Sequence, residues 1–141
     1  MTIDYYPTIL EITGAQGDTD HNQRVDGMSL CPLLRDPSSS LDRDLYWHYP
    51  HYHAGGDSPY GAIRSGPWRL IEFYEDDSVE LYNLSEDIGE QDNLAARMPD
   101  KANSLREKLH AWRNQVGAQM PSPNPKHDPD RAQRVASGRG D

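Results

Sequence analysis

The sequence predicts an α+β fold: a small four-stranded antiparallel sheet packed by one long C-terminal helix and preceded by a short helix. Four short runs rich in aromatic and branched residues follow one another between residues 45 and 84, and their short connections favour antiparallel neighbours. Apolar side chains then recur at helical spacing from residue 98 to residue 116. Hydrophobic residues make up only 35% of the 141 residues, and Gly and Pro contribute 11 each, so the core must be small.

The short helix is expected at residues 4–14. Asp4 is a candidate N-terminal cap, Pro7 falls in the first turn, and Gly14 stands at the end. Apolar residues cover more of this helix than a free N-terminal helix should expose, so it is expected to pack against something bulky. Residues 15–25 are expected to form a polar loop, and the Ser/Pro-rich residues 36–40 a surface connection.

Two strands are expected at residues 45–49, ended by Pro50, and at residues 60–64. A hairpin follows, in which residues 68–74 and 79–84 flank the polar residues 75–78. Alternation along its first strand predicts one dry face and one mixed face. One face carries Trp68, Leu70, Glu72 and Tyr74, and the other carries Arg69, Ile71 and Phe73.

The long helix is expected to begin near Pro99 and to end at Gly117. Its apolar stripe consists of Met98, Ala102, Leu105, Leu109, Trp112 and Val116. Four prolines follow from residue 121, and they predict an extended or disordered tail at residues 118–141.

Composition excludes several classes of protein. The net charge of −9 argues against nucleic acid as a partner, because affinity for phosphate comes from clustered Lys and Arg. A single cysteine, Cys31, excludes an internal disulfide and a multi-cysteine zinc site. No apolar run approaches the roughly 20 residues of a membrane span, so no membrane partner is expected. No secretory signal pattern is expected either, and localisation is left open.

Seven short motifs occur in an order that resembles the C-terminal third of the type I sulfatases, which are calcium-dependent hydrolases of the alkaline-phosphatase-like superfamily. They begin with Asp4-Tyr-Tyr-Pro-Thr-Ile-Leu and continue at residues 26–30, 47–52, 61–64, 68–71, 81–84 and 92–95. The resemblance implies that residues 1–43 are the end of a large catalytic domain and a crossing segment. It further implies that residues 44–117 are a C-terminal subdomain and that residues 118–141 are a flexible tail.

The catalytic apparatus of that family has no counterpart here. Sulfatases use a formylglycine made from Cys or Ser in a C/S-x-P-x-R motif, and a calcium ion held by Asp and Asn. Cys31 and Arg35 match the ends of that motif, but Pro32 stands one position early, and the metal set is absent. Formylglycine and calcium are therefore implied for the complete parent only, with a missing N-terminal catalytic domain as the partner of this chain.

His48, His51 and His53 are the candidate binding residues. Three imidazoles so close could hold a metal ion, but on an extended chain His48 would point away from the other two, and a fourth ligand is lacking. A second interpretation is an ordinary polar loop whose groups are satisfied. The resemblance implies a third, in which this loop lines the substrate cleft and donates hydrogen bonds to a sulfated small molecule or glycan.

Arg64 and Arg69 flank a Gly-Pro turn and could bind an anion, but pairing with surface carboxylates is the better interpretation. Trp112 is expected in the core.

The leading hypothesis is a C-terminal fragment of a sulfatase that hydrolyses sulfate esters, with sulfated glycans as the expected substrates; the fragment alone is expected to be inactive. Two alternatives remain open: a stand-alone carbohydrate- or protein-binding module, and an inactive remnant. Because the chain begins within an apolar helix rather than a polar linker, the fragment is favoured over the module.

Overall fold

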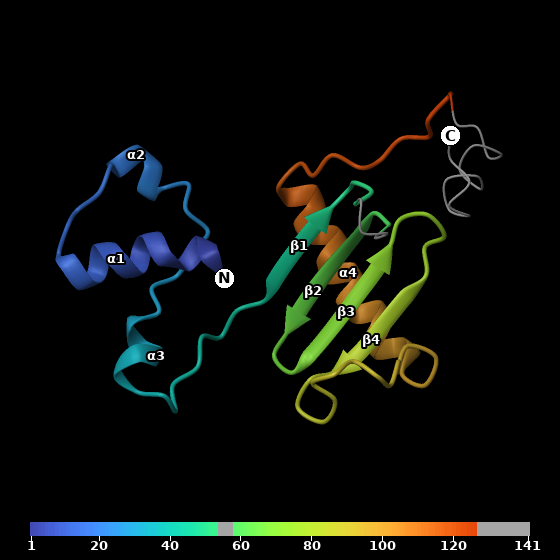
Figure 1. Cartoon of the computed structure of the whole chain (residues 1–141), viewed down its shortest axis with the longest axis horizontal. Coiled ribbons are helices and arrows are strands. Elements are labelled where there is room, and N and C mark those ends of the chain that lie inside the picture. Colours follow the sequence, from blue (N-terminus) through green and yellow to red (C-terminus); the bar gives the residue numbers. More distant parts are fainter. Residues whose placement is uncertain (54–57, 127–141) are drawn as a thin grey trace, which may run out of the picture. The chain divides into compact units, whose positions relative to one another are not determined.

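The structure is a computed structural model that describes residues 1–53 and 58–126 (Figure 1). The chain divides into two compact units, Met1–Arg43 (unit 1) and Asp44–Asp141 (unit 2). Most of the tail predicted at residues 118–141 lies outside the described residues, and residues 118–126 contain no helix or strand. None of the helices within residues 1–53 and 58–126 combines the length and apolarity that crossing a membrane requires.

Unit 2 is built on a four-stranded antiparallel sheet in the order β1-β2-β3-β4. The strands are β1 (Leu45–Tyr49), β2 (Tyr60–Ser65), β3 (Trp68–Phe73) and β4 (Val79–Asn83). Each pairs with the next along the chain, as their short connections predict. The predicted fold class is therefore confirmed.

Helix α4 (Pro99–Gln115) covers one face of this sheet (Figure 1). The core between them is formed by buried apolar side chains from three strands and the helix, namely Ile63, Leu70, Leu81, Ala102, Leu105 and Leu109. Trp112 is half-buried and stacks on Tyr46 with ring centroids 4.9 Å apart. The apolar stripe is shorter than predicted: Met98 and Val116 are 37% and 51% exposed, because they are the caps of α4.

Unit 1 contains η1 (Thr2–Asp4), α1 (Tyr5–Thr13), α2 (Thr19–Asn22) and α3 (Cys31–Arg35). The predicted first helix is present and ends at Gly14, which has a φ of 70°. The loop predicted at residues 15–25 is wrong in part, because it contains α2. The Asp18 side chain caps that helix by accepting a hydrogen bond from the backbone nitrogen of His21 at 2.8 Å.

Asp4 stands at the predicted N-cap position of α1, but its side chain does not cap the helix. Its fully buried carboxylate accepts hydrogen bonds from the backbone nitrogen of Met28 (3.0 Å), from Arg43 (2.5 Å) and from the Met1 nitrogen (2.6 Å). Burial by itself raises the pKa of Asp4, but these donors outweigh it and hold the pKa well below its ordinary value. One carboxylate thus fixes three segments of unit 1.

We expect Leu109→Ala to lower the free energy of unfolding by about 2–5 kcal/mol, because the side chain is fully buried between α4 and the sheet. Chemical denaturation followed by circular dichroism measures this. Leu34→Ala makes the same change at an exposed side chain and should have little effect. Equal losses in the two variants would contradict the assigned core.

Candidate functional site

His48 lies in β1 on the face that α4 covers, since it pairs with Gly61, which in turn pairs with Glu72. Its Nε2 lies 2.9 Å from the carbonyl oxygen of Gln119, and its Nδ1 lies 2.8 Å from the hydroxyl oxygen of Tyr74. A carbonyl only accepts, so Nε2 carries the hydrogen, and in the neutral ring Nδ1 accepts from Tyr74. His48 is thus held at both ring nitrogens.

Gly61 makes room for this arrangement. A Cβ atom at position 61 would lie 2.3 Å from the hydroxyl oxygen of Tyr74, so any side chain there would push the tyrosine away from His48. Tyr74 is half-buried, and burial raises its pKa. The guanidinium of Arg113 lies over its ring, 5.2 Å from the centroid.

His51 and His53 lie beyond the end of β1, on the exposed segment that follows Pro50. The ring of His51 meets Tyr49 edge-on, with centroids 5.7 Å apart. The structure therefore places His48 in the sheet and the other two histidines at the surface. Within the part of the chain that is described, no group of three His, Cys, Asp or Glu side chains could hold a metal ion.

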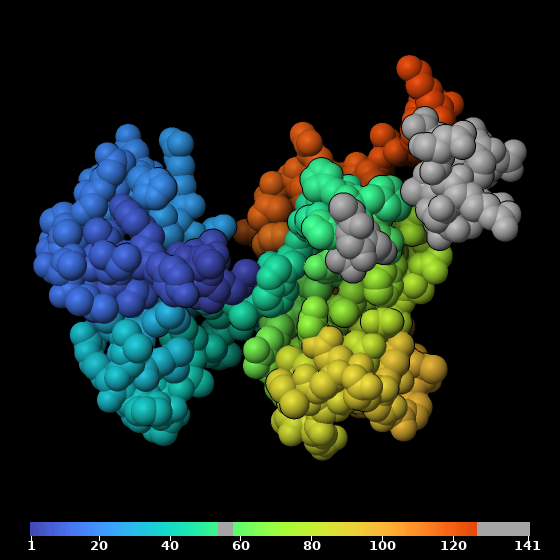
Figure 2. All heavy atoms as spheres, in the orientation of Figure 1, coloured from blue at the N-terminus to red at the C-terminus, as the bar shows by residue number. Residues whose placement is uncertain are grey.

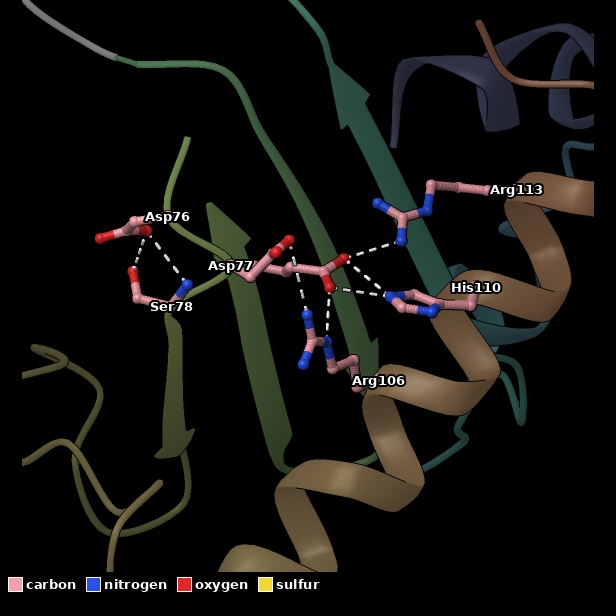
Figure 3. A network of polar contacts seen from close by, with 7 residues as sticks. Asp76, Asp77, Ser78, Arg106, His110 and Arg113 are labelled. Carbon is pink, nitrogen blue, oxygen red and sulfur yellow. Dashed lines mark hydrogen bonds and ion pairs between the residues drawn. The ribbon is translucent and has the colours of Figure 1, made fainter. Parts of the chain in front are cut away.

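A buried carboxylate, Glu72, forms the densest polar network of unit 2 (Figure 3). It lies in β3 beneath α4 and accepts hydrogen bonds from Nε of Arg106 (2.5 Å), Nε2 of His110 (2.8 Å) and Nη2 of Arg113 (2.8 Å). At the edge of the network, Arg106 also lies 3.7 Å from the exposed Asp77.

Burial alone raises the pKa of Glu72. The hydrogen bonds from His110 and Arg106 and the charge of Arg113 outweigh that effect and hold the pKa below its ordinary value of 4.5. Glu72 is therefore ionised at neutral pH. Nη1 of Arg113 is buried without a hydrogen-bond partner among the described residues; its ring contact with Tyr74 lies alongside.

Sequence reasoning missed this network, although two signals were present. Glu72 shares one face of the predicted hairpin with Trp68 and Leu70, and a carboxylate buried on such a face requires a partner. Arg106, His110 and Arg113 are spaced by four and three residues, which places three donors along one side of α4.

The opposite face of the sheet contains a hollow of about 230 Å³, lined by Ser58, Tyr60, Arg69, Ile71 and Phe73. Arg69 forms an ion pair with Glu90, in line with the interpretation that it serves a carboxylate. Arg64 instead donates from Nε to the carbonyl oxygen of Gly66 at 3.4 Å.

Cys31 is buried in unit 1, and its thiol lies 4.0 Å from the carbonyl oxygen of Thr8. This buried position is one of packing within unit 1.

Comparison with known proteins identifies the family. The model of the C-terminal region of N-sulphoglucosamine sulphohydrolase matches residues 1–116. The chain belongs to this sulfatase family. The resemblance drawn from the seven motifs is thereby confirmed.

Two sulfatases illustrate the relationship. The chain is 40% identical over 123 residues to a sulfatase of Formosa agariphila, covering 79% of this chain and 22% of that protein. It is 31% identical over 118 residues to arylsulfatase K of Xenopus laevis, covering 77% of this chain and 21% of that protein. The chain thus spans about a fifth of the length of these curated relatives.

Solved structures agree. BT4656, in complex with its substrate D-glucosamine-2-N,6-O-disulfate, aligns with a TM-score of 0.62 and 28% identity, over 88% of this chain and 25% of that one. The 2-O GAG sulfatase BT1596 aligns with a TM-score of 0.68 and 21% identity, over 90% of this chain and 27% of that one, and its likeness concerns the fold alone.

We expect Glu72→Gln to lower the free energy of unfolding of unit 2 by about 3 kcal/mol at neutral pH, because it leaves the cations of α4 without their buried partner. Asp77→Asn, the same chemical change at the exposed carboxylate beside Arg106, should have little effect.

The pH dependence gives an independent check. A carboxyl group whose pKa is lower in the folded state than in the unfolded state stabilises the fold. This contribution is complete above the unfolded pKa, which is about 4.5 for Glu72, and it is lost as the pH falls through the folded pKa. The stability difference between the wild type and Glu72→Gln should therefore shrink as the pH falls below ~4.5. A difference that grew in acid would contradict the assignment.

Proposed function

We propose that this chain is the C-terminal segment of a sulfuric ester hydrolase that acts on sulfated glycans, and that the segment has no catalytic activity alone. The observation that supports this most directly is the match of residues 1–116 to a C-terminal sulfatase region, together with coverage of only about a fifth of the relatives. Residues 1–43 would then complete the catalytic domain, residues 44–117 would form the subdomain, and residues 118–141 would form its tail.

The surface of unit 1 supports a partner for α1. Ile9 and Ile12 are 58% and 64% exposed on that helix, and Tyr5 and Ile3 beside them are exposed as well. Large apolar side chains gathered in this way mark an interaction site. We propose that they pack against the preceding catalytic domain. This favours the fragment over a stand-alone binding module, which would be expected to cover such residues itself.

Sulfatases generally use formylglycine and calcium, and the described residues of this chain do not fit either group. Cys31 is buried outside the required pattern, and no three suitable ligands lie together in the described residues. We therefore assign both groups to the preceding part of the parent and derive no catalytic step from this chain.

His51 and His53 are proposed to contribute to substrate binding in the parent. Both are exposed, and an imidazole can donate to a sulfate or hydroxyl oxygen while its ring contacts a sugar. His48 is engaged by Tyr74 and Gln119, so its proposed part is to position the segment that bears the other two. BT4656 binds a sulfated glucosamine, and a substrate of that class is proposed here.

The central experiment joins this chain to the part of the Formosa agariphila sulfatase that precedes the matched region. We expect the isolated chain to hydrolyse no aryl sulfate, and the chimera to hydrolyse one that the unmodified Formosa enzyme accepts. A folded, soluble chimera that stays inactive beside an active unmodified enzyme would refute the proposed function.

In the same chimera, we expect His51→Ala and His53→Ala each to raise KM for a sulfated saccharide about fivefold to tenfold with kcat unchanged. A rise of this size corresponds to the loss of one hydrogen bond between the protein and the substrate. His21→Ala makes the same change on α2 in unit 1 and serves as the matched control. Unchanged KM in both variants would remove these histidines from the substrate site.

A further inference from the structure

We propose that Tyr74 and Glu75, which directly follow β3, are positioning residues of the parent enzyme: they hold residues 50–53 so that the histidines there reach a sulfated saccharide. This inference rests on the proposed function. Tyr74 and Glu75 act through that segment and do not touch the substrate themselves. The segment, called the histidine segment below, consists of Pro50, His51, Tyr52 and His53.

The histidine segment begins where the sheet brings the ends of β1 and β3 to the same edge. Strand β1 runs in the same direction as β3, because each is antiparallel to β2 between them. Figure 2 shows the segment at the surface of unit 2, at the end of the sheet toward which the arrows of β1 and β3 point in Figure 1. The residues that follow β3 are therefore within reach of the residues that follow β1.

Tyr74 holds both ends of the connection between β1 and β2. Its hydroxyl donates to Nδ1 of His48 at 2.8 Å, and its backbone nitrogen donates to the carbonyl oxygen of Pro59 at 3.0 Å, just before β2 begins. Pro50 follows His48 by two positions, and its ring fixes φ at about −65°. The direction in which the histidine segment leaves β1 therefore has little freedom.

Tyr74 is itself held from two sides. The guanidinium of Arg113 lies over its ring, 5.2 Å from the centroid, and Gly61 leaves the space that the hydroxyl occupies. Arg113 in turn donates to Glu72 at 2.8 Å. The anchor of the histidine segment is thereby joined to the buried network beneath α4.

Glu75 holds the middle of the histidine segment, because its Oε1 accepts a hydrogen bond from the hydroxyl of Tyr52 at 2.8 Å. The turn that carries Glu75 is closed: the backbone nitrogen of Phe73 donates to the carbonyl oxygen of Ser78 at 3.0 Å. The backbone nitrogen and hydroxyl of Ser78 donate to Asp76 at 3.0 and 2.7 Å (Figure 3). The carboxylate of Glu75 favours the protonated phenol and raises the pKa of Tyr52 above its ordinary value of 10.0.

The contact between Tyr52 and Glu75 suits positioning better than folding. Tyr52 is 71% exposed and Glu75 is exposed as well, so their hydrogen bond contributes little to stability. It nevertheless fixes the residue that stands between His51 and His53. Binding groups that are held in place before the substrate arrives lose less conformational freedom on binding. Loss of this anchor should therefore weaken binding and leave the fold intact.

A double-mutant cycle in the Formosa chimera tests the anchor at Glu75. We expect Tyr52→Phe and Glu75→Ala each to raise KM for a sulfated saccharide about threefold with kcat unchanged. Because both changes remove the same hydrogen bond, the double variant should raise KM no further. Glu75→Gln keeps an acceptor oxygen and should return KM to within about twofold of the unsubstituted chimera.

Glu86→Ala makes the same change as Glu75→Ala at an exposed carboxylate in the loop after β4, and it should leave KM unchanged. Effects of Tyr52→Phe and Glu75→Ala that add, or a KM that Glu75→Ala does not move, would overturn the inference.

A second background separates positioning from direct contact with the substrate. In a chimera that already carries His51→Ala and His53→Ala, neither Glu75→Ala nor Tyr74→Phe should change KM, because the groups that they position are gone. With both histidines present, Tyr74→Phe removes only the hydroxyl and should raise KM about threefold. A further rise in the histidine-free background would show direct contact and would overturn the positioning role.

A measurement on the isolated full chain tests the contact without enzyme activity. Tyrosine labelled with ¹³C at Cζ reports the ionisation of each phenol by NMR, and Tyr52→Phe assigns the signal of Tyr52. We expect the pKa of Tyr52 to be lower in Glu75→Ala than in the wild type, and to be unchanged in Glu86→Ala. Equal values in Glu75→Ala and the wild type would contradict the anchor.

The outcomes separate the two proposals. An active chimera whose KM responds to His51→Ala and His53→Ala but not to Glu75→Ala overturns this inference alone. An inactive chimera overturns the proposed function, and this inference falls with it.

Discussion

The arrangement of unit 2 depends on the buried carboxylate of Glu72 and the three donors that α4 brings to it. Apolar burial is non-directional, so Leu105 and Leu109 alone would hold the helix on the sheet without fixing how far it slides. Arg106, His110 and Arg113 converge on one carboxylate, and a shift of the helix by one turn would separate them from it. The network therefore sets the position of α4 along β3, while the apolar core supplies most of the attraction.

The same alternation that directs Glu72 toward α4 directs its neighbours Ile71 and Phe73 to the other side. One side of the sheet thus combines apolar packing with a fully engaged charge, and the other presents aromatic and aliphatic groups together with Arg64, Arg69 and Glu80. The polar network fixes the position of α4 on one face of such a subdomain, whereas contacts on the other face are mainly apolar and non-directional. That division fits a segment that works as part of a larger polypeptide.

The sheet could be predicted because strand alternation and short connections are local properties, and the observed strands agree with the predicted ones to within a residue or two. Contacts between distant residues could not. Asp4 could be predicted as the residue that begins α1, but the sequence did not show that Arg43, 39 positions away, binds its carboxylate. Helix α2 was not predicted because four residues are too few to show a helical periodicity of apolar side chains. Alternation placed Glu72 on the same face as Leu70, but the sequence did not reveal that this face is the buried one or which side chains of the helix reach Glu72.

His48 and Gln119, which meet through one hydrogen bond, are separated by 71 positions. During synthesis, β1 therefore leaves the ribosome long before the residue that completes its contacts, and α4 emerges only shortly before that residue. Unit 2 therefore closes only after α4 and Gln119 have been made. In a parent whose catalytic portion comes first, that portion would have the opportunity to fold before this subdomain is completed.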